Sequence, residues 1–573
     1  MGKVKASTGR FSSLSYTPSR ESGSSTDGVM SSMHPGEIVE GVLRWASSNT
    51  AQALQNLSLW SLASGTVIII VLIRFAQASL TWLRTWSILR TFPGPEGYFM
   101  FCGKLFKFCT SQPELDFNVG LLQVFLGLAQ IYHKAKAYRV YLGLKPHVYI
   151  YSAEAMEVVL SESKNLDKTY AYKLVQDWLG NGLITSPGDI WKRRRRLLRP
   201  AFHQRIIEDS LTAMNSAADD LVTTLLQQSA QEGFVSNVLP HVQRCSLRIT
   251  CEAAMGVNIE ALSGYRRYVK AILAVGESFM HRFVRPWLWN SFFYYRCTSA
   301  GGYQQRNVNI IRHLAIQAIE ARRELLTEST AKCTEAAELP SKERRCFMDI
   351  LLNSQLTAKD SEKLTLDDIC DEVVTFMFAG HDTTTASILF TLYLLGLYPD
   401  VQQKVYDELQ EVLQGEERPL TLEDVKRLSY LERVTKESLR LFPPVPLVGR
   451  NITEDIVIDG HVVPKGTEVL LFILALHRDT TLFPEPEKFN PDRFLPENIA
   501  SLHPFAWVPF SAGSRNCIGQ KLAQVEVKIV VATLVRSCHL ISLDTRDKLQ
   551  LASEIVLRSK DPIRMRFLSR TLR

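Results

Sequence analysis

The most informative stretch of this 573-residue sequence is Phe510-Ser-Ala-Gly513-Ser-Arg515-Asn-Cys517-Ile-Gly519. A single cysteine stands between two glycines, and a run of residues typical of a helix follows directly. Glycine lets the backbone turn tightly and approach a large flat ligand without a Cβ in the way. A cysteine just before a helix N-terminus is stabilised as a thiolate by the helix dipole and the free N–H groups. The alternative is a buried structural cysteine in an ordinary loop.

A thiolate in this position can be the proximal ligand of a haem, and Arg515 can pair with a haem propionate. The pattern F-x-x-G-x-R-x-C-x-G resembles the haem-binding signature of the cytochrome P-450 superfamily at every defined position. The resemblance covers about residues 92–570. It implies noncovalent haem b with Cys517 as the axial thiolate and metal ligand. It also assigns Phe510, Gly513 and Gly519 to the cofactor-binding loop.

A second motif, Ala379-Gly-His-Asp382-Thr383-Thr, lies inside a long predicted helix. A glycine and hydroxyl side chains weaken regular helix bonding, which suits a groove in the helix; the alternative is a helix with a Thr-rich polar face. The string resembles the oxygen-activation motif of the superfamily. The resemblance implies that Thr383 and Asp382 are the catalytic residues, which hold and relay protons.

The strongest charge run is Trp191-Lys-Arg-Arg-Arg195-Arg-Leu-Leu-Arg199. It is typical of a solvated basic helix face or of a nucleic-acid patch. Trp191 and Arg195 stand one helical turn apart, and the resemblance implies that both bind a haem propionate. The remaining cations are then expected to face outward, where they can dock an acidic redox partner: Lys192, Arg193, Arg194 and Arg196.

Glu437-Ser-Leu-Arg440 places opposite charges on one face of a predicted helix, where a simple surface pair is the alternative. The resemblance implies that Arg493, in Pro491-Asp-Arg493-Phe494, joins this pair in a buried network with a structural role. It also places Arg450, after a looser motif, among the propionate ligands.

The sequence predicts a mainly α fold with a small β portion, as a single large cytochrome P-450-type haem domain behind an N-terminal membrane anchor. Apolar spacing predicts helices, and a Pro-rich, β-branched zone at 442–516 predicts short strands. The predicted helices cover residues 205–232, 305–328, 364–397, 399–414 and 423–441.

Four segments are expected along the chain. Residues 1–44 form a Ser-rich disordered tail. Residues 45–76 form a transmembrane anchor, because no charge stands between Arg44 and Arg74 and a bilayer core needs about 20 apolar residues. Residues 77–95 form a basic linker and a Pro/Gly hinge, and residues 96–573 form the haem-binding monooxygenase domain.

Composition narrows the class of protein further. Hydrophobic residues make up 46% and charged residues 22%, which excludes wholesale disorder. Ten cysteines without a C-x-x-C pair exclude a disulfide scaffold and disfavour a thiolate zinc site. The net charge of +7 fits a membrane surface, an acidic protein or nucleic acid. With an anchor and a haem loop present, no nucleic-acid partner is expected.

Basic residues follow the apolar run, so the positive-inside rule predicts a single-pass protein of the endoplasmic reticulum membrane with its catalytic domain facing the cytosol. The resemblance implies a haem-thiolate monooxygenase that inserts one oxygen atom of O2 into an apolar substrate. Fatty acids, sterols and other lipid-like compounds remain open as substrates. Electrons are expected from NADPH through a flavoprotein reductase, with cytochrome b5 as a candidate second partner.

Three segments look most like the fourth family of the superfamily, which hydroxylates lipids: Thr375–Thr384, Arg196–His203 and Pro509–Gln520. Ala379 stands where many of those enzymes carry a glutamate that esterifies the haem, so noncovalent haem is expected and the preference for the terminal carbon is not assigned. Two alternatives remain. One is a haem-thiolate isomerase or dehydratase, and the other is a non-catalytic membrane-tethered binding protein.

Overall fold

The computed structural model describes residues 35–95, 116–142, 145–161, 166–335, 346–357 and 363–570. Most of the predicted tail, residues 1–34, lies outside the described residues. The chain divides into two compact units, Met1–Leu83 and Arg84–Arg573, which are treated separately below.

The N-terminal helix α1 runs from Pro35 to Leu89. It begins inside the predicted tail and continues through the predicted linker, because neither glycine nor proline interrupts residues 77–89. It ends just before the Phe92-Pro93-Gly94-Pro95 segment. The apolar side chains of residues 67–73 are 51–60% exposed. Within the described residues, one helical segment, Ala63–Leu89, is long and apolar enough to cross a membrane.

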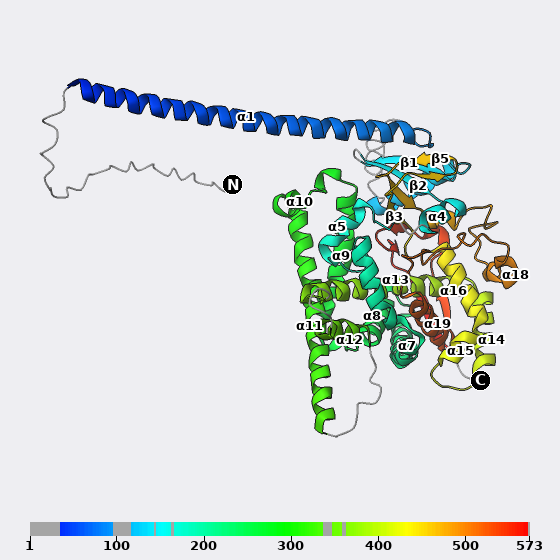
Figure 1. Cartoon of the computed structure of the whole chain (residues 1–573). Helices are drawn as coiled ribbons and strands as arrows, with labels where there is room; N and C mark the ends of the chain where they lie inside the picture. Colours follow the sequence, from blue (N-terminus) through cyan, green and yellow to red (C-terminus); the bar gives the residue numbers. More distant parts are fainter. Residues whose placement is uncertain are drawn as a thin grey trace, which may run out of the picture. The chain divides into compact units, whose positions relative to one another are not determined.

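The second unit is mainly helical, and it has a small β portion, which confirms the predicted class (Figure 1). Its longer α-helices are α3 (Phe117–Ile131), α4 (Ala153–Ser161), α5 (Tyr170–Leu179), α6 (Gly188–Leu198), α7 (Gln204–Glu232), α8 (Leu239–Thr250), α9 (Tyr265–Phe283), α10 (Ser291–Cys297), α11 (Ser299–Glu335), α12 (Phe347–Thr357), α13 (Leu366–Leu397), α14 (Pro399–Leu413), α15 (Leu422–Arg427), α16 (Ser429–Leu441) and α19 (Gln520–Ser537). Two single-turn helices are α17 (Ile473–Leu476) and α18 (Pro496–Ile499).

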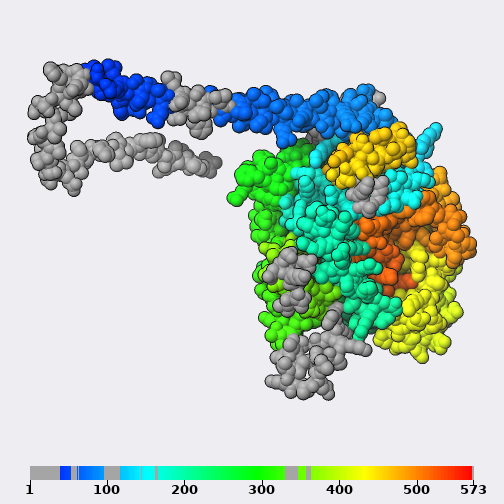
Figure 2. Space-filling model, viewed as in Figure 1, coloured from blue at the N-terminus to red at the C-terminus, as the bar shows by residue number. Residues whose placement is uncertain are grey.

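The strands form one four-stranded sheet and three antiparallel two-stranded pairs. The larger sheet has the order β1-β2-β6-β3, with β2 and β6 parallel and the other neighbours antiparallel. Figure 2 shows the gold surface of the region that holds β4 and β5 beside the cyan region that holds β1 and β2. The bounds are β1 (Ala137–Leu142), β2 (Lys145–Ile150), β3 (Val448–Asn451), β4 (Ile456–Ile458), β5 (His461–Val463), β6 (Glu468–Leu471), β7 (Cys538–Ser542), β8 (Leu551–Ser553), β9 (Leu557–Ser559) and β10 (Met565–Ser569).

The long helix α13 forms the centre of the helical core. It packs against α8, α16 and α19, and Figure 1 shows it crossing the middle of this unit. A capping box between Thr365 and Asp368 starts the helix. Nearly every side chain from Ile369 to Leu395 is buried, so the helix is apolar all round instead of amphipathic.

One predicted helix is two helices in the structure. The spacing predicted a single helix over 423–441, whereas α15 ends at Arg427 and α16 starts at Ser429. Leu428, with φ −74° and ψ 73°, leaves the helical conformation between them. Apolar spacing continues across this break, which is why the pattern did not detect it.

The structure brings Glu437, Arg440 and Arg493 together in the core. Arg440 donates to both carboxylate oxygens of Glu437, at 2.7 and 2.9 Å, and both side chains are fully buried. Arg493 Nε lies 3.4 Å from Glu437 Oε1. Arg440 also donates to the carbonyl of His477, whose ring accepts from the Val508 N–H at 3.0 Å. The network is thereby connected to the backbone just before Phe510.

We expect Glu437→Gln to lower the free energy of unfolding by about 3–5 kcal/mol, because it leaves the buried Arg440 charge without its partner. Urea unfolding followed by circular dichroism measures the change. The matched control is Glu423→Gln, which breaks an exposed pair with Lys426 at the same i,i+3 spacing and should cost less than about 1 kcal/mol. Equal effects of the two substitutions would contradict a structural role for the buried network.

Candidate active site

The loop from Phe510 to Gly519 folds back on itself before α19. The Cys517 N–H donates to the Phe510 carbonyl at 3.0 Å, and Gly519 is the N-cap of the helix. Gly513 has φ +69°, and a Cβ there would lie 1.9 Å from the carbonyl oxygen of Leu160 at the end of α4. A glycine is therefore required by the backbone and by α4.

Of the two glycines, Gly513 has the positive φ of the tight turn that the sequence suggested. Both were expected to make room for a flat ligand. Gly513 makes room for α4, and neither glycine lines the cavity described below. Gly519 has a negative φ of −90°, and a Cβ there would only reach the Phe202 ring at 3.7 Å. The pattern of glycines in the sequence does not reveal which neighbour approaches them.

Seven of the predicted site residues line one cavity of about 380 Å³. Its other walls are largely apolar and come from α3, α5, α9, α13 and the segment between β8 and β9; they include Leu121, Phe279, Phe283, Phe378 and Ile555. The seven residues are Trp191, Arg195, Thr383, Arg450, Phe510, Arg515 and Cys517. The fold thus joins segments that are more than 300 residues apart in the sequence.

Two opposing effects act on the pKa of the Cys517 thiol. Burial raises its pKa, whereas the Gly519 N–H and the nearby Arg195 lower it. The net direction is upward, although the Cys517 side chain is exposed where it lines the cavity. A bound metal cation deprotonates a coordinating thiol, and this site offers Cys517 to the cavity for such a cation.

Several cations gather on the cavity wall. Arg450 and Arg515 are 2% and 9% exposed, and burial lowers the pKa of both guanidinium groups, that of Arg515 to about 10. Arg515 stacks over the Trp191 ring at 4.7 Å and donates to the Ser186 carbonyl at 2.6 Å. Its Nε and Nη1 atoms have no hydrogen-bond partner among the described residues.

Besides Arg195, Arg450 and Arg515, the cavity wall has a fourth cation, Lys168, which the sequence motifs did not predict. It lines the cavity, its ammonium lies 4.5 Å from the centre of the Tyr172 ring, and burial together with Arg450 and Arg515 lowers its pKa strongly. In the part of the chain that is described, no carboxylate pairs with Lys168, Arg450 or Arg515. A lone lysine in a loop has no local pattern that marks it, so only the fold identifies this residue.

The motif residues Thr383 and Asp382 of helix α13 lie in two different environments. The Thr383 hydroxyl lines the cavity and donates to the Ala379 carbonyl at 2.8 Å. Asp382 is 1% exposed, does not line the cavity, and accepts two bonds from Arg558 at 2.6 and 2.7 Å. Arg558 comes from β9, and the sequence gave no indication of this partner. The two predicted catalytic residues, Asp382 and Thr383, therefore do not line the same cavity.

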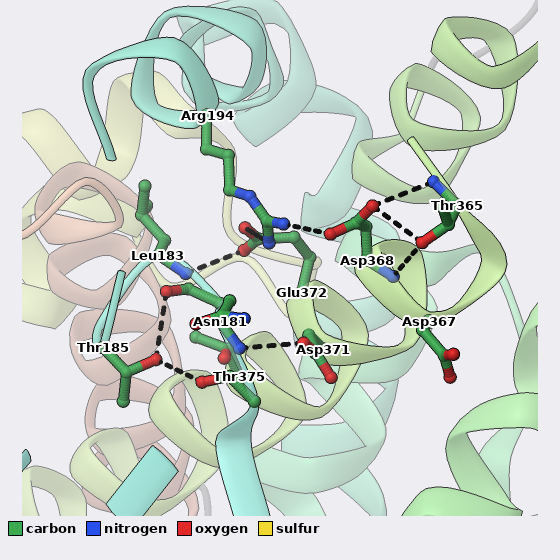
Figure 3. Close-up of polar contacts among 12 residues, drawn as sticks. Asn181, Leu183, Thr185, Arg194, Thr365, Asp367, Asp368, Asp371, Glu372 and Thr375 are labelled. Carbon is green, nitrogen blue, oxygen red and sulfur yellow. Dashed lines mark hydrogen bonds and ion pairs between the residues drawn. The ribbon is translucent and has the colours of Figure 1, made fainter. Parts of the chain in front are cut away.

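The prediction for Arg194 was wrong. It was expected to face outward, but it is 3% exposed and bonds to α13 (Figure 3). Its guanidinium contacts Glu372 at 2.9 Å and Asp368 at 2.5 Å. Glu372 also accepts from the Leu183 N–H at 3.0 Å, and burial raises the pKa of its carboxyl to about 7. Lys192, Arg193 and Arg196 are exposed.

Residues 99–567 match the family model described as Cytochrome P-450. The chain belongs to the cytochrome P-450 family. Cytochrome P-450 4V2 of Rattus norvegicus is 39% identical over 516 residues, covering 89% of this chain and 96% of the rat protein. The human protein of that name is also 39% identical, over 519 residues, with the same two coverages. These relatives place the chain in family 4 of the superfamily.

Another family-4 relative and a solved structure agree. Cytochrome P-450 4c3 of Drosophila melanogaster is 39% identical over 442 residues, covering 75% of this chain and 82% of the fly protein. The crystal structure of the cytochrome P450DA heme domain has a TM-score of 0.67 at 22% identity and covers 84% of this chain and 98% of that one. The structural match supports the cytochrome P-450 fold.

Membership makes the chain a haem-thiolate monooxygenase, with a haem held by a cysteine thiolate. The residues of the cavity fit this cofactor. A haem brings one metal for a thiol and two propionate groups, and the cavity offers Cys517 beside buried cations that lack carboxylate partners. Trp191, Arg450, Arg515 and Lys168 are accordingly the residues we expect to hold the propionates, while Arg195 also donates to Asn516 in the thiolate loop.

We expect Lys168→Met to speed haem loss about tenfold, because a hydrogen bond to a charged group contributes roughly 1.5–3 kcal/mol. Transfer of haem to apomyoglobin, followed by absorbance, measures the rate. Lys173→Met is the control, since Lys173 is exposed on α5. Haem loss at the wild-type rate in Lys168→Met would remove this residue from the cofactor site.

Proposed function

We propose that the chain hydroxylates an apolar, lipid-like substrate such as a fatty acid or a sterol. The observation that carries the proposal is the single cavity in which Cys517 and Thr383 share walls with Phe279, Phe283 and Ile555. Burial of apolar surface drives binding by about 25 cal/mol per Å², so such walls favour a hydrocarbon over a polar compound. A polar, water-soluble substrate would leave its own groups unpaired there.

The haem, when bound, supplies the oxygen chemistry, and the chain's residues support it. Cys517 would hold the haem iron through its thiolate. Thr383 holds a hydroxyl at the cavity wall, where it can orient or pass a proton. The aromatic and aliphatic walls keep water from the reacting groups.

Electrons are proposed to come from NADPH through a flavoprotein reductase, with cytochrome b5 as a second candidate donor. The sequence has no Gly-rich dinucleotide loop, which supports an external source of electrons. The exposed residues Lys192, Arg193 and Arg196 of α6 form a basic surface for an acidic partner. Arg194 is left out of this surface because α13 binds it.

Noncovalent haem b and a membrane location complete the proposal. Ala379 lines the cavity with a methyl group and has no carboxyl group to esterify a haem. The apolar segment Ala63–Leu89 supports a single-pass anchor in the endoplasmic reticulum membrane with the haem domain on the cytosolic side.

The reduced, carbon-monoxide-bound difference spectrum tests the thiolate. We expect the Soret band typical of thiolate-ligated haem in the wild type and its loss in Cys517→Ala, since alanine offers no ligand. Cys297→Ala is the control, because Cys297 is an exposed cysteine outside the cavity. A wild type that takes up no haem would overturn the proposal.

Thr383→Ala tests the cavity hydroxyl. We expect NADPH consumption to continue while product yield falls by about 10²-fold and hydrogen peroxide rises, because without this hydroxyl to direct the proton, two electrons and two protons leave with O2 as peroxide. Thr383→Ser keeps a hydroxyl and should restore most of the yield. Product and peroxide are measured together in one reaction, and unchanged coupling in Thr383→Ala would remove the residue from proton transfer.

A further inference from the structure

The first part of helix α1 carries an exposed apolar face. Val39, Val42 and Leu43 are 58–62% exposed, and Trp45 is 69% exposed. These side chains precede the apolar segment Ala63–Leu89, so they are not part of the candidate membrane span itself. Large apolar side chains that gather on one exposed face mark an interaction surface.

The exposed apolar side chains occupy one broad arc of the helix. Successive residues of an α-helix are about 100° apart around its axis, so Leu43 and Trp45 mark two edges about 160° apart. Val39, Val42 and Ala46 fall between these edges, at the spacing i, i+3 and i+7. The arc is therefore wider than the narrow seam that two helices of a coiled coil share.

The opposite arc is polar and has no net charge. It carries Glu40, Arg44, Ser47 and Ser48, and the Arg44 guanidinium donates to Glu40 at 3.2 Å across one turn. Within residues 39–52 these two are the only charged side chains. A helix with one broad apolar arc and one polar arc is typical of helices that lie in the plane of a membrane interface.

The length of α1 places this face outside the bilayer. At 1.5 Å per residue, the segment Ala63–Leu89 extends about 40 Å, which matches a bilayer with its headgroups. Residues 35–62 add about 42 Å on the N-terminal side. If α1 stayed straight, the apolar arc of residues 39–46 would remain in water, which is unfavourable.

A weak point in the helix separates the two parts of α1. Gly65 stands near the start of the apolar segment, and a Cβ there would meet no atom within 4 Å, so packing does not require a glycine. The Ser64 hydroxyl donates to the Ser61 carbonyl at 3.0 Å. A glycine weakens a helix, and helices bend at Gly/Ser pairs and where a hydroxyl bonds back to the backbone. The pair Ser64-Gly65 is therefore a place where α1 can bend.

We propose that residues 39–52 of α1 form an amphipathic helix in the headgroup region of the leaflet on the N-terminal side of the anchor. The inference rests on the membrane anchor of the proposed function, and the orientation proposed there makes this the lumenal leaflet. The apolar arc enters the lipid, the polar arc faces water, and α1 bends at Ser64-Gly65.

Lipid is the partner that the observations favour over a second copy of the chain. The helix continues directly into the anchor, which keeps its apolar arc beside the membrane surface. Trp45 stands at an edge of this arc, and indole rings collect at the level of the headgroups. Since Glu40 and Arg44 pair within one helix, they leave no unpaired charge to select a partner helix.

The accessibility of nitroxide labels tests the inference on the full-length, haem-loaded protein in phosphatidylcholine nanodiscs. A ketone-bearing amino acid is placed at one position at a time and coupled to the nitroxide, which leaves the cysteines unmodified. Oxygen concentrates in lipid, whereas a nickel chelate stays in water. Labels at Val39, Val42 and Ala46 should be reached by oxygen and shielded from the chelate, at a depth of about 5–10 Å. Labels at Ser47 and Ser48 should show the reverse.

The distance between two labels tests the bend. In a straight helix, labels at Val42 and Leu83 lie about 60 Å apart, whereas a right-angle bend at Gly65 brings them to about 45 Å. Pulsed electron–electron resonance on nanodiscs that hold one copy measures this distance. We expect the shorter value, and a distance near the longer one would overturn the inference.

A matched pair of substitutions tests the apolar arc. Val42→Glu places a charge on the lipid side and should abolish the shielding of a label at Val39 from the chelate. Ser48→Glu adds the same charge to the polar arc and should leave that shielding unchanged. Equal effects of the two substitutions would contradict immersion of this one face.

Two further outcomes would overturn the inference. One is access of the chelate to every label from Val39 to Ser48, which would mean that the helix stands in water. The other is shielding of the apolar arc from both reagents, with magnetic coupling between labels on two copies, because a second copy would then cover the arc. A label at Ile70 reports on the anchor separately: access of the chelate there would mean that the proposed anchor itself fails.

Discussion

The burial of unpaired positive charge around Cys517 is the constraint on which the haem site depends. Arg450, Arg515 and Lys168 approach one cavity, and none has a carboxylate partner among the described residues. Removing an ion from water costs several kcal/mol even after relaxation, so these cations oppose folding unless anions join them. Two propionate groups would supply those anions, and a metal cation would lower the pKa of a thiol that coordinates it. The cofactor is thus a part of the core in electrostatic terms.

The side chains of the short helix α6 lie in three different surroundings. Trp191 and Arg195 face the cavity, Arg194 is bonded to α13, and the remaining cations are exposed. Because Glu372 accepts from both Arg194 and the Leu183 N–H, α13 fixes α6 and the preceding loop together. A partner that docks on the exposed face would therefore contact a helix whose position is set by buried ion pairs.

The helix α13 combines two tasks that conflict in an ordinary core helix. It must be buried on all sides, yet it must present hydroxyl groups to a cavity. Thr383 and Thr384 satisfy their hydroxyls on the carbonyls of Ala379 and Gly380, so the polar groups are bonded inside the helix itself. Asp382 does not line the cavity and forms an ion pair with Arg558.

The sequence alone determined the family and the mainly helical class, and its contiguous motifs predicted residues that line one cavity, such as Cys517, Arg515 and Thr383. These depend on side chains that are neighbours in the chain, and local spacing records them directly. The tertiary structure decided the positions of Lys168, Arg194 and Arg558, which lie near charged residues of other helices and strands. Burial also raises the pKa of the Glu372 carboxyl to about 7, although Arg194 lies beside it. Solvation is a property of the packed fold, and no local pattern of residues specifies which charge will lose its water.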